Sequence, residues 1–394
     1  MFSKLPTYAG DPILGLIGEF ERDERPNKVN LGVGIYQDEN GDVPFLPSVL
    51  EAERRYLASP RKAGYLPMEG DARYRQVIRN LLFGIDGRGA GEVSIVQTVG
   101  GSGALRLGAD FLKRAYPDSR VLVSDPTWDN HIGIFEGAGF EVGQYRYFDP
   151  KTRGLDMDWM LIDLGGARPQ DVILLAPCCH NPTGVDPNRD EWCRILDVIQ
   201  SRQLIPFLDI AYQGFAENLE DDAWVIREMV RRRMDFIVSS SFSKILSLYG
   251  ERCGALSVYT PIASRASNIL GQLKLCVRRN YSSPPTHGME LVVGVLTDVE
   301  LRAQWIRELA GMRERIRDMR NRLKEALART APLFDATFLV EQRGMFAYTG
   351  LSEEQIRALR DESGIYAAAS GRICVSGLNP SNIDYVAEAI AKVL

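Results

Sequence analysis

The sequence predicts an α/β fold, with a large domain built on a mainly parallel sheet and a smaller α+β domain. Short β-rich runs alternate with helical patterns, which is typical of a parallel sheet covered by helices. Several of these runs are apolar with little alternation, as expected for strands buried on both faces. The length of 394 residues exceeds what one small core needs and indicates two domains.

The strand candidates are short and largely apolar, and they cover residues 120–124, 172–176, 205–210, 236–239 and 255–259. Polar or reactive residues follow directly after several of them, namely Asp125, the run Cys179-His180-Asn181, Asp209 and Lys244. Ligands of open α/β sheets bind at the carboxyl ends of the strands. The sequence therefore predicts one pocket that these residues share.

The smaller unit is predicted to follow a long amphipathic helix. Apolar residues recur there at helical spacing between charged ones, at positions 316, 319, 323, 326 and 327. Ser352 and Gln355 form a capping box that opens another helix, which Gly364 can end. We expect a strand over residues 372–375 and a terminal helix that runs to Leu394.

Composition and charge exclude several classes of function. The net charge is −5 and both signs are interspersed, which argues against nucleic acid as a partner. No apolar stretch approaches the roughly 18 residues that span a bilayer, and no signal-peptide pattern opens the chain. The six cysteines lack CxxC spacing and are interpreted as reduced core residues. We therefore expect a cytoplasmic protein, without a membrane segment and, with only three histidines, without a metal site.

The first motif that points to chemistry is the glycine-rich run Gly100-Gly101-Ser102-Gly103, which precedes a helical pattern. Such a turn offers free N–H groups and a partial positive charge to an anion, typically a phosphate. A plain tight turn explains the run equally well. The run does not fit the Walker pattern, because no Lys-Ser/Thr pair follows at the required spacing.

The second motif is the run from Ser239 to Lys244, with Arg252 eight residues further on. Hydroxyls, an ammonium and a guanidinium at this spacing could bind a phosphate and an aldehyde together. A lysine that is desolvated at a strand end can lose its proton and attack a carbonyl. The alternatives are a polar loop with a surface lysine, or a serine-lysine hydrolase with Ser241 as nucleophile and an independent oxyanion site.

Two further runs complete the set. Asp209 lies in the run from Phe207 to Tyr212, and an aspartate at the end of an apolar strand is costly unless it is paired. A protonated pyridine nitrogen would be such a partner. The run from Pro177 to Gly184 is rich in Asn, Pro and Gly and by itself predicts only a loop. The four runs lie in the order expected for sheet loops that converge on one cofactor.

These motifs resemble those of the class I aspartate and aromatic-amino-acid aminotransferases, which are fold-type I pyridoxal-phosphate (PLP) enzymes. The resemblance extends from Asp11-Pro12-Ile13-Leu14 to Ala369-Ser370-Gly371-Arg372 and is strongest over residues 178–184, 209–215 and 241–244. It implies a large domain with a mostly parallel seven-stranded sheet and a small domain built from both termini. The implied ranges are 1–44 for the amino-terminal segment, 45–311 for the large domain and 312–394 for the carboxyl-terminal part.

The resemblance also implies roles toward the cofactor. Lys244 would hold PLP as a Schiff base and shuttle the proton, and Asp209 would keep the pyridine nitrogen protonated. Tyr212 and Asn181 would donate hydrogen bonds to the phenolic oxygen. The phosphate group would be bound by charge-assisted hydrogen bonds from one set of residues. That set comprises Gly101, Ser102, Ser241, Ser243 and Arg252, with Tyr65 from the other subunit of a homodimer.

Trp128 matches the aromatic residue that stacks on the pyridine ring, whereas core packing is the alternative for a lone tryptophan. Trp128 and Asn181 would also line the substrate. His131 matches a partner of the ring aspartate and is not expected to act as a general base. His180, beside the cofactor asparagine, is interpreted as a structural residue.

Substrate recognition would depend on two arginines. Arg372 matches the guanidinium that binds the α-carboxylate in a bidentate manner. Arg278 matches the arginine that binds the side-chain carboxylate of aspartate or glutamate across the dimer, which leaves its neighbour Arg279 on the surface. Gly34, with its neighbour Val33, matches a segment that closes over the substrate, and Phe346 matches an aromatic lining residue.

Ser283 favours the aromatic branch of the family, because aspartate-preferring members usually carry asparagine at the matching position. The runs 243–250 and 65–70 also resemble bacterial tyrosine aminotransferases. We therefore expect ping-pong transfer of the amino group from Phe, Tyr or Trp, and also Asp or Glu, to 2-oxoglutarate. The alternatives are an aspartate aminotransferase and a PLP-dependent lyase or decarboxylase. A PLP-binding regulator is not expected, since such proteins carry a DNA-binding domain ahead of this one and ten residues precede Asp11.

Overall fold

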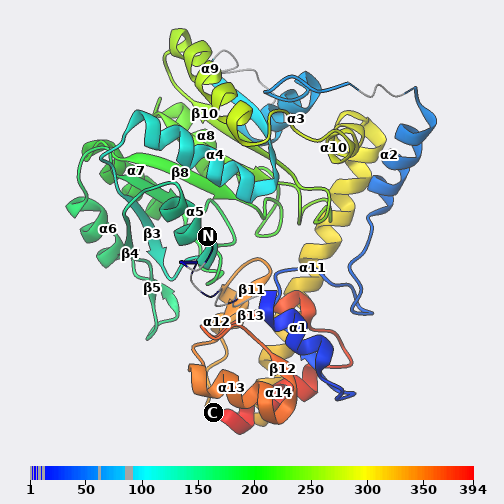
Figure 1. The fold of residues 1–394 in the computed structure, drawn as a ribbon. Helices are drawn as coiled ribbons and strands as arrows, with labels where there is room; N and C mark the ends of the chain where they lie inside the picture. The colour runs from blue at the N-terminus through cyan, green and yellow to red at the C-terminus, as the bar shows by residue number, and fades with distance from the viewer. Residues whose placement is uncertain are drawn as a thin grey trace. The chain divides into compact units, whose positions relative to one another are not determined.

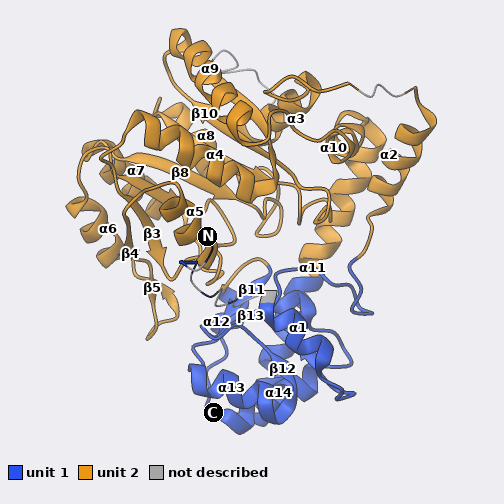
Figure 2. Cartoon of the chain, viewed as in Figure 1, with its two compact units in different colours: residues 1–43, 315–341, 345–394 blue, residues 44–314, 342–344 orange. Residues whose placement is uncertain are grey.

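The computed structural model describes residues 14–60, 64–84 and 92–394, together with residues 2, 4, 5, 7 and 10. The motif residues 11–13 lie outside the described ranges. The chain divides into two compact units, which Figure 2 colours separately. Unit 1 comprises residues 1–43, 315–341 and 345–394, and unit 2 comprises residues 44–314 and 342–344.

Unit 2 is built on a seven-stranded sheet with the order β2-β10-β9-β8-β7-β3-β4 (Figure 1). The strands are β2 (Val93–Val99), β3 (Val121–Asp125), β4 (Val142–Arg146), β7 (Val172–Leu175), β8 (Ile205–Ile210), β9 (Phe236–Ser241) and β10 (Cys253–Tyr259). The run from β9 to β4 is parallel, whereas β10 is antiparallel to both β9 and β2. The predicted α/β fold with a mostly parallel seven-stranded sheet is confirmed.

The five strands predicted from sequence are all present, with ends that differ by up to two residues. Strands β2 and β4 were not among the sequence candidates. The positions of the polar residues relative to the strand ends also differ slightly from the prediction. Asp125 and Asp209 lie inside β3 and β8 rather than after them, while Lys244 does follow the end of β9. The predicted carboxyl end is correct for β8 and lies one residue short for β3 and two residues short for β9, and the two aspartates belong to the strands.

Helices form two groups around this sheet. One group, α4 (Gly100–Ala115), α5 (Asp129–Gly137) and α9 (Ala263–Asn280), shares a hydrophobic core with the strands. The other group is joined by successive helix contacts and comprises α3 (Ala72–Phe83), α8 (Trp224–Arg231), α7 (Arg189–Ser201) and α6 (Met157–Gly166). Beyond these, α2 (Pro47–Ala58) packs on α10 (His287–Thr297), and β5 (Phe148–Asp149) pairs with β6 (Gly154–Leu155).

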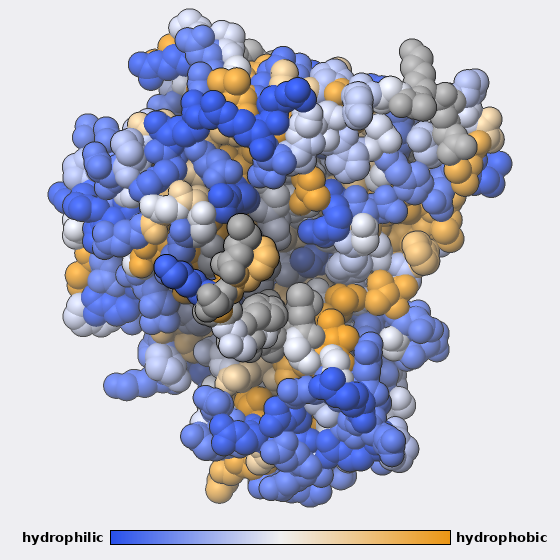
Figure 3. Space-filling view, viewed as in Figure 1, coloured by the Kyte–Doolittle hydropathy of each residue, from blue (hydrophilic) through white to orange (hydrophobic). Residues whose placement is uncertain are grey.

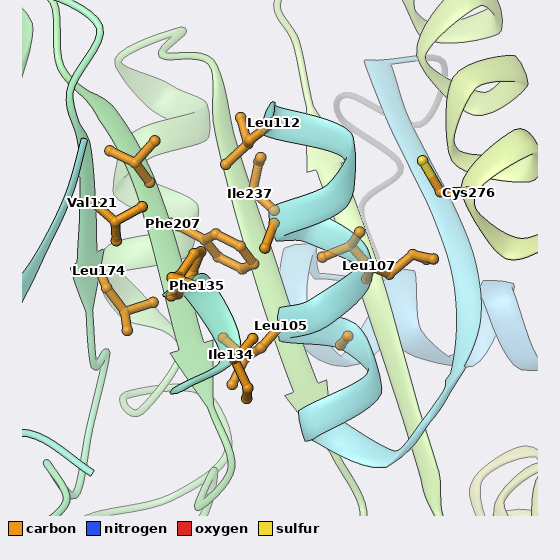
Figure 4. Packing of buried hydrophobic residues seen from close by; sticks show 14 of the residues in the cluster. Leu105, Leu107, Leu112, Val121, Ile134, Phe135, Leu174, Phe207, Ile237 and Cys276 are labelled. Atoms are coloured by element: carbon orange, nitrogen blue, oxygen red, sulfur yellow. The ribbon is translucent and has the colours of Figure 1, made fainter. Parts of the chain in front are cut away.

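The core beneath α4 explains how closely this helix approaches the sheet (Figure 4). Phe207 of β8 is fully buried, and its ring meets the ring of Phe135 edge-on at 5.8 Å between centroids. A Cβ at Gly108 of α4 would lie only 2.5 Å from the Phe207 ring. Because glycine has no side chain, α4 can pack directly over the centre of the sheet, which fixes its amino-terminal end at the sheet edge. Burying an aromatic ring of this kind contributes about 1.5–3 kcal/mol.

Unit 1 contains two small sheets and several helices. Its strands are β1 (Val29–Asn30), parallel to β12 (Ile365–Tyr366), and β11 (Phe346–Tyr348), antiparallel to β13 (Arg372–Cys374). Its helical elements are α1 (Leu14–Arg22), α12 (Phe338–Glu341), α13 (Glu353–Ser363), the short 3-10 turn η2 (Val375–Gly377) and α14 (Ile383–Val393). The long helix α11 (Val299–Thr330) belongs to both units.

The local sequence signals of unit 1 are confirmed. Ser352 and Gln355 form the capping box of α13, and Gly364 ends that helix in the left-handed conformation with φ of 64°. The apolar positions predicted along α11 are all buried, at residues 316, 319, 323, 326 and 327. A helix stop at Gly364 is expected because only glycine adopts this conformation at no steric cost.

Surface and cysteine chemistry give a few further facts. In the described ranges, no helix is long and apolar enough to cross a membrane. All six cysteines are free thiols, and five of them are buried.

The face shown in Figure 3 is largely hydrophilic, with apolar side chains gathered over α2. On that helix Leu50 and Leu57 are 47% and 55% exposed, two turns apart along one face.

Candidate functional site

The amino-terminal end of α4 carries the glycine-rich run and faces Arg252. Gly100 has φ of +67°, and its N–H donates to the carbonyl of Arg252 at 2.8 Å. A Cβ at Gly100 would lie 2.5 Å from Nη2 of Arg252. A glycine is therefore required here both by the backbone conformation and by the guanidinium that packs on it. The result is a cation held beside free N–H groups at a helix amino terminus, which favours an anion.

Two serine hydroxyls extend this cationic group. Ser241 donates a hydrogen bond of 3.1 Å to Ser243, and Nη1 of Arg252 donates one of 3.3 Å to the same Ser243 hydroxyl. A Cβ at Gly101 would lie 3.2 Å from Cβ of Ser241, so the first turn of α4 borders these hydroxyls. We call Gly100, Gly101, Ser241, Ser243 and Arg252 the anion cradle. Its guanidinium, hydroxyls and backbone N–H groups suit a phosphate dianion.

A carboxylate with defined partners lies on the neighbouring strand. Asp209 of β8 accepts a hydrogen bond of 2.8 Å from the Ser239 hydroxyl on Oδ1. Its Oδ2 lies 3.2 Å from Nε2 of His131, whose Nδ1 lies 2.8 Å from the Thr127 hydroxyl. Because a carboxylate only accepts, Nε2 of His131 carries the proton, and in a neutral ring Nδ1 accepts from Thr127. Asp209 is thereby oriented by hydrogen bonds to both of its oxygens.

Trp128 stands at the start of α5, one turn before His131. The two rings meet edge-on, with 5.2 Å between centroids and 82° between planes. Trp128 is only partly buried, and it packs against the hydrophobic core without being enclosed by it. One face of the indole is therefore compatible with stacking on a ligand, as the sequence predicts, in addition to its packing role.

Lys244, Tyr212 and Asn181 come from the loops after three successive parallel strands, β9, β8 and β7. The ammonium of Lys244 lies 5.3 Å from the centroid of the Tyr212 ring, and Tyr212 itself is 6% exposed. The loop of Asn181 is tied to that of Tyr212 through Cys179, whose thiol donates to the Tyr212 carbonyl at 3.9 Å. An amine, a phenol and a carboxamide are thus supplied by adjacent loops at one sheet edge.

His180, beside Asn181, is buried and fully hydrogen-bonded. Its Nε2 lies 2.8 Å from the Ser124 hydroxyl, its Nδ1 lies 2.7 Å from the Thr183 hydroxyl, and its ring stacks on Tyr147 at 4.1 Å. Burial lowers the pKa of His180 to about 3. The imidazole is therefore neutral at physiological pH and holds the Asn181 loop in place rather than transferring protons.

Three of the predicted substrate residues form a cluster within unit 1. Arg372 is 5% exposed and donates to the Gly32 carbonyl at 2.7 Å. Its guanidinium lies 4.4 Å from the centroid of the Phe346 ring. A Cβ at Gly34 would lie 2.7 Å from the same ring, so glycine lets the 32–34 segment pack directly on Phe346. The cluster fixes the plane of a guanidinium, which is what bidentate binding of a carboxylate needs.

Two of the predicted site residues, Tyr65 and Arg278, have exposed side chains. The Tyr65 side chain is 98% exposed, and Arg278 is exposed at the end of α9, where it donates to the Ser282 hydroxyl. Among the described residues, neither is brought to the anion cradle or to Lys244. Arg279 lies beside a separate cavity of about 670 Å³. Ser102 lines a second cavity, of about 460 Å³, with Tyr281.

The sequence predicts no role for Ser239, which lies in the run that ends at Lys244, or for Thr127, which lies between Asp125 and Trp128. The spacing of Thr127 and His131, four residues apart at a helix start, is a usable signal for that contact. The contact between Ser239 and Asp209 has no local signal, because it depends on the register between β8 and β9.

Comparison with known proteins places the chain in a family. A family model described as aminotransferase class I and II matches residues 26–390. The chain is 52% identical to a tyrosine aminotransferase of Klebsiella pneumoniae and 48% identical to an aspartate aminotransferase of Pseudomonas aeruginosa, in each case over 100% of both chains. It is also similar to the crystal structure of an aromatic-amino-acid aminotransferase of Burkholderia pseudomallei covalently bound to pyridoxal phosphate. That likeness has a TM-score of 0.98, 49% identity, and coverage of 100% of this chain and 99% of that one. The resemblance expected from the motifs is confirmed, and the chain belongs to the class I and II aminotransferases.

Proposed function

We propose that this protein is an aromatic-amino-acid aminotransferase that uses PLP. It transfers the amino group of Phe, Tyr or Trp, and also of Asp or Glu, to 2-oxoglutarate by a ping-pong mechanism. The observation that carries the proposal is that the anion cradle, Asp209 of β8 and Lys244 after β9 come from neighbouring elements of one sheet and its covering helix α4. Full-length similarity to tyrosine and aromatic-amino-acid aminotransferases supports the substrate class.

The residues present fit PLP. The anion cradle supplies a cation, two hydroxyls and a helix amino terminus for a phosphate, and Cβ atoms at Gly100 or Gly101 would crowd it. Asp209 supplies a negative charge for a protonated pyridine nitrogen, and Lys244 supplies the amine for the aldehyde. Bound PLP supplies an electron sink that stabilises negative charge on the substrate Cα.

The side chains of unit 2 then have defined tasks. Lys244 would hold the cofactor through its amine and, when a substrate amine takes its place, would be the base that moves the proton of the substrate Cα. Asp209 keeps the proton on the pyridine nitrogen, while Ser239 and His131 hold the carboxylate in its orientation. Tyr212 and Asn181 would donate hydrogen bonds to the phenolic oxygen and so stabilise a negative charge on it.

Substrate recognition uses the unit 1 cluster and residues of a second subunit. Arg372 binds the α-carboxylate, with Phe346 beneath the guanidinium and Gly34 in the segment that closes over the substrate. Trp128 stacks on the pyridine ring and, with Asn181, lines the bound amino acid. Arg278 binds the distal carboxylate of a dicarboxylic substrate and moves aside for an aromatic ring.

We further propose a cytoplasmic homodimer in which each subunit completes the active site of the other. The exposure of Tyr65 and Arg278 in the single chain supports this arrangement, because both need a partner surface to be useful. The exposed apolar residues of α2 support it as well, since such side chains are common at protein interfaces. The domain ranges 1–44, 45–311 and 312–394 are part of the same proposal.

Aspartate aminotransferase is the second candidate function. The presence of Arg278 and the 48% identity to a Pseudomonas aeruginosa aspartate aminotransferase favour it. The test is the specificity constant kcat/KM for phenylalanine, tyrosine and aspartate, each measured with 2-oxoglutarate as acceptor. The proposal requires the aromatic values to equal or exceed that for aspartate. Product formation without any oxo acid would instead indicate a lyase or decarboxylase.

A further inference from the structure

Two carboxylates, a partly buried Asp186 and a buried Asp222, accept backbone hydrogen bonds from the loops that carry Asn181 and Tyr212. The first is Asp186, five residues after Asn181 in the same loop. Its two oxygens accept hydrogen bonds from the backbone N–H groups of Cys179 and His180, at 2.7 Å and 2.8 Å. Cys179 has φ of +51°, so the chain just before Asn181 adopts a conformation that L-residues rarely take. Asp186 therefore holds the loop in a conformation that the backbone alone would not favour.

The second carboxylate is Asp222, which holds the loop after Tyr212 in the same way. One of its oxygens accepts from the N–H groups of Gly214 and Ala216, at 2.7 Å and 3.1 Å. The other oxygen accepts from the N–H of Glu217 at 2.9 Å. Asp222 is 4% exposed. Each of the two loops is thus wrapped around the carboxylate of one aspartate.

The two loops are joined into one assembly. The Cys179 thiol donates to the Tyr212 carbonyl at 3.9 Å, which connects the first loop directly to the second. The backbone N–H of Arg343 donates to the Gly184 carbonyl at 2.6 Å, and its guanidinium forms an ion pair with Glu217. Arg343 therefore contacts both loops. The guanidinium of Arg313 donates to the carbonyl of Gly214 at 3.0 Å.

We propose that Asp186 and Asp222 are positioning residues that together set the relative placement of Asn181 and Tyr212. They touch neither substrate nor cofactor, and they act through the backbone of the two loops. This inference rests on the proposed function, in which Asn181 and Tyr212 donate hydrogen bonds to the phenolic oxygen of PLP.

Both aspartates have pKa values above the ordinary range of a carboxyl group. Burial and the charge of Asp222 raise the pKa of Asp186 more than its backbone hydrogen bonds and Arg343 lower it, so that the pKa is about 6. Burial raises the pKa of Asp222 to about 6 as well, opposed by its backbone hydrogen bonds and Arg313. The charge of Asp186 also faces the Tyr147 hydroxyl, and both carboxylates face the thiol of Cys178.

Because these pKa values differ between the folded and unfolded states, the stability of the fold depends on pH. A carboxyl whose folded pKa lies above its unfolded value contributes stability below the unfolded value, and this contribution is lost as pH rises through the folded pKa. At neutral pH both aspartates therefore lower the stability of the fold relative to neutral groups.

The experiment compares Asp186→Asn and Asp222→Asn with the matched control Asp171→Asn. Asp171 is 1% exposed and also accepts backbone N–H groups, from Arg120 and Arg168, at 3.1 Å and 3.0 Å. It precedes the first residue of β7, at the end of the strand opposite to Asn181. Its pKa is lowered, with Arg120 and backbone hydrogen bonds outweighing burial. Each protein is loaded with PLP, and its visible absorbance is titrated with pH.

We expect both variants to raise the pH midpoint of the absorbance change by about half a unit or more. Weaker hydrogen bonds leave the negative charge of the phenolic oxygen less stabilised, which favours the protonated form of the bound cofactor. Asp171→Asn should keep the wild-type midpoint. Urea unfolding of the cofactor-free proteins adds a second readout. Relative to wild type, the stability of Asp186→Asn and Asp222→Asn should rise between about pH 4 and about pH 6, where only the wild-type carboxyl titrates, and should change no further above that range. The stability difference between Asp171→Asn and wild type should stay constant over the same range.

Arg343→Gln covers the case in which an aspartate variant does not fold, because the Arg343 side chain is 45% exposed. Its removal deletes the ion pair with Glu217 that joins the two loops and should raise the absorbance midpoint in the same direction. The proposal is overturned if these variants bind PLP and keep the wild-type midpoint within 0.1 unit. Failure of the wild-type protein and the control to show any cofactor absorbance would instead overturn the proposed function.

Discussion

Ser239 and Asp209 face each other across the parallel strands β9 and β8, and the serine hydroxyl donates a 2.8 Å hydrogen bond to the carboxylate. His131 lies 3.2 Å from the other carboxylate oxygen. The carboxylate is therefore oriented by the sheet itself and by α5, before any ligand binds. Such preorganisation matters because a charge that is already in place costs no reorganisation during the reaction.

The first prediction concerns this carboxylate. Asp209→Ala should lower kcat/KM by about 10³-fold or more, because the pyridine nitrogen loses the charge that keeps it protonated. Ser239→Ala should cost only about tenfold, the value of one hydrogen bond to a charged group. The matched control is Ser240→Ala, since Ser240 is the next residue on β9 and its hydroxyl donates to the Ala255 carbonyl instead. Equal losses for Ser239→Ala and Ser240→Ala would contradict the assigned contact.

The second prediction concerns the anion cradle. Gly100→Ala should raise the Kd for PLP by about tenfold or more, because positive φ costs an L-residue about 1–2 kcal/mol and the new methyl group would displace Arg252. The Kd is measured by fluorescence titration of the cofactor-free protein. Gly165→Ala is the control, since no atom lies within 4 Å of its added Cβ in α6. An unchanged Kd in Gly100→Ala would show that the phosphate binds elsewhere.

The third prediction concerns Arg372. Arg372→Lys should lower kcat/KM by about 10- to 100-fold for aromatic and dicarboxylic substrates alike, because a point charge replaces a planar bidentate donor. The comparison variant is Arg329→Lys, at an exposed arginine of unit 1 that pairs with Asp384. Steady-state kinetics with phenylalanine and with aspartate measure both effects. A loss confined to aspartate would assign the distal carboxylate to Arg372 and exclude the proposed role.

The fourth prediction concerns specificity. Ser283→Asn should lower the ratio of kcat/KM for phenylalanine to that for aspartate, because an amide at this position would restrain Arg278 against the distal carboxylate. Ser283→Ala supplies no amide and should keep the wild-type ratio. Competition assays with both amino acids in one reaction measure the ratio directly. An unchanged ratio in Ser283→Asn would remove the reason for linking Ser283 to aromatic preference.

The sequence predicts the chemical groups of the site better than their supporting contacts. Lys244, Asp209 and Arg252 lie in long, specific runs, and the fold class follows from apolar strands such as 205–210. The register that places Ser239 against Asp209 involves residues 30 positions apart and has no local signal. Strand β4 was missed because its sequence Val-Gly-Gln-Tyr-Arg is half polar and only its tyrosine is buried.

The raised pKa values of Asp186 and Asp222 depend on burial by distant segments, which composition and spacing do not reveal. Tyr65 and Arg278 mark another limit of sequence reasoning. Their predicted roles require a second subunit, and a single chain leaves both side chains exposed.

The most direct test of the central claim is a single-turnover experiment on the PLP-loaded protein without acceptor. Phenylalanine, tyrosine and aspartate are each titrated while the cofactor absorbance is followed, with Lys244→Ala in parallel. We predict conversion to the pyridoxamine absorbance, with aromatic kcat/KM equal to or above that for aspartate, and a loss of conversion in Lys244→Ala. Conversion by aspartate alone, or undiminished conversion in Lys244→Ala, would contradict the account.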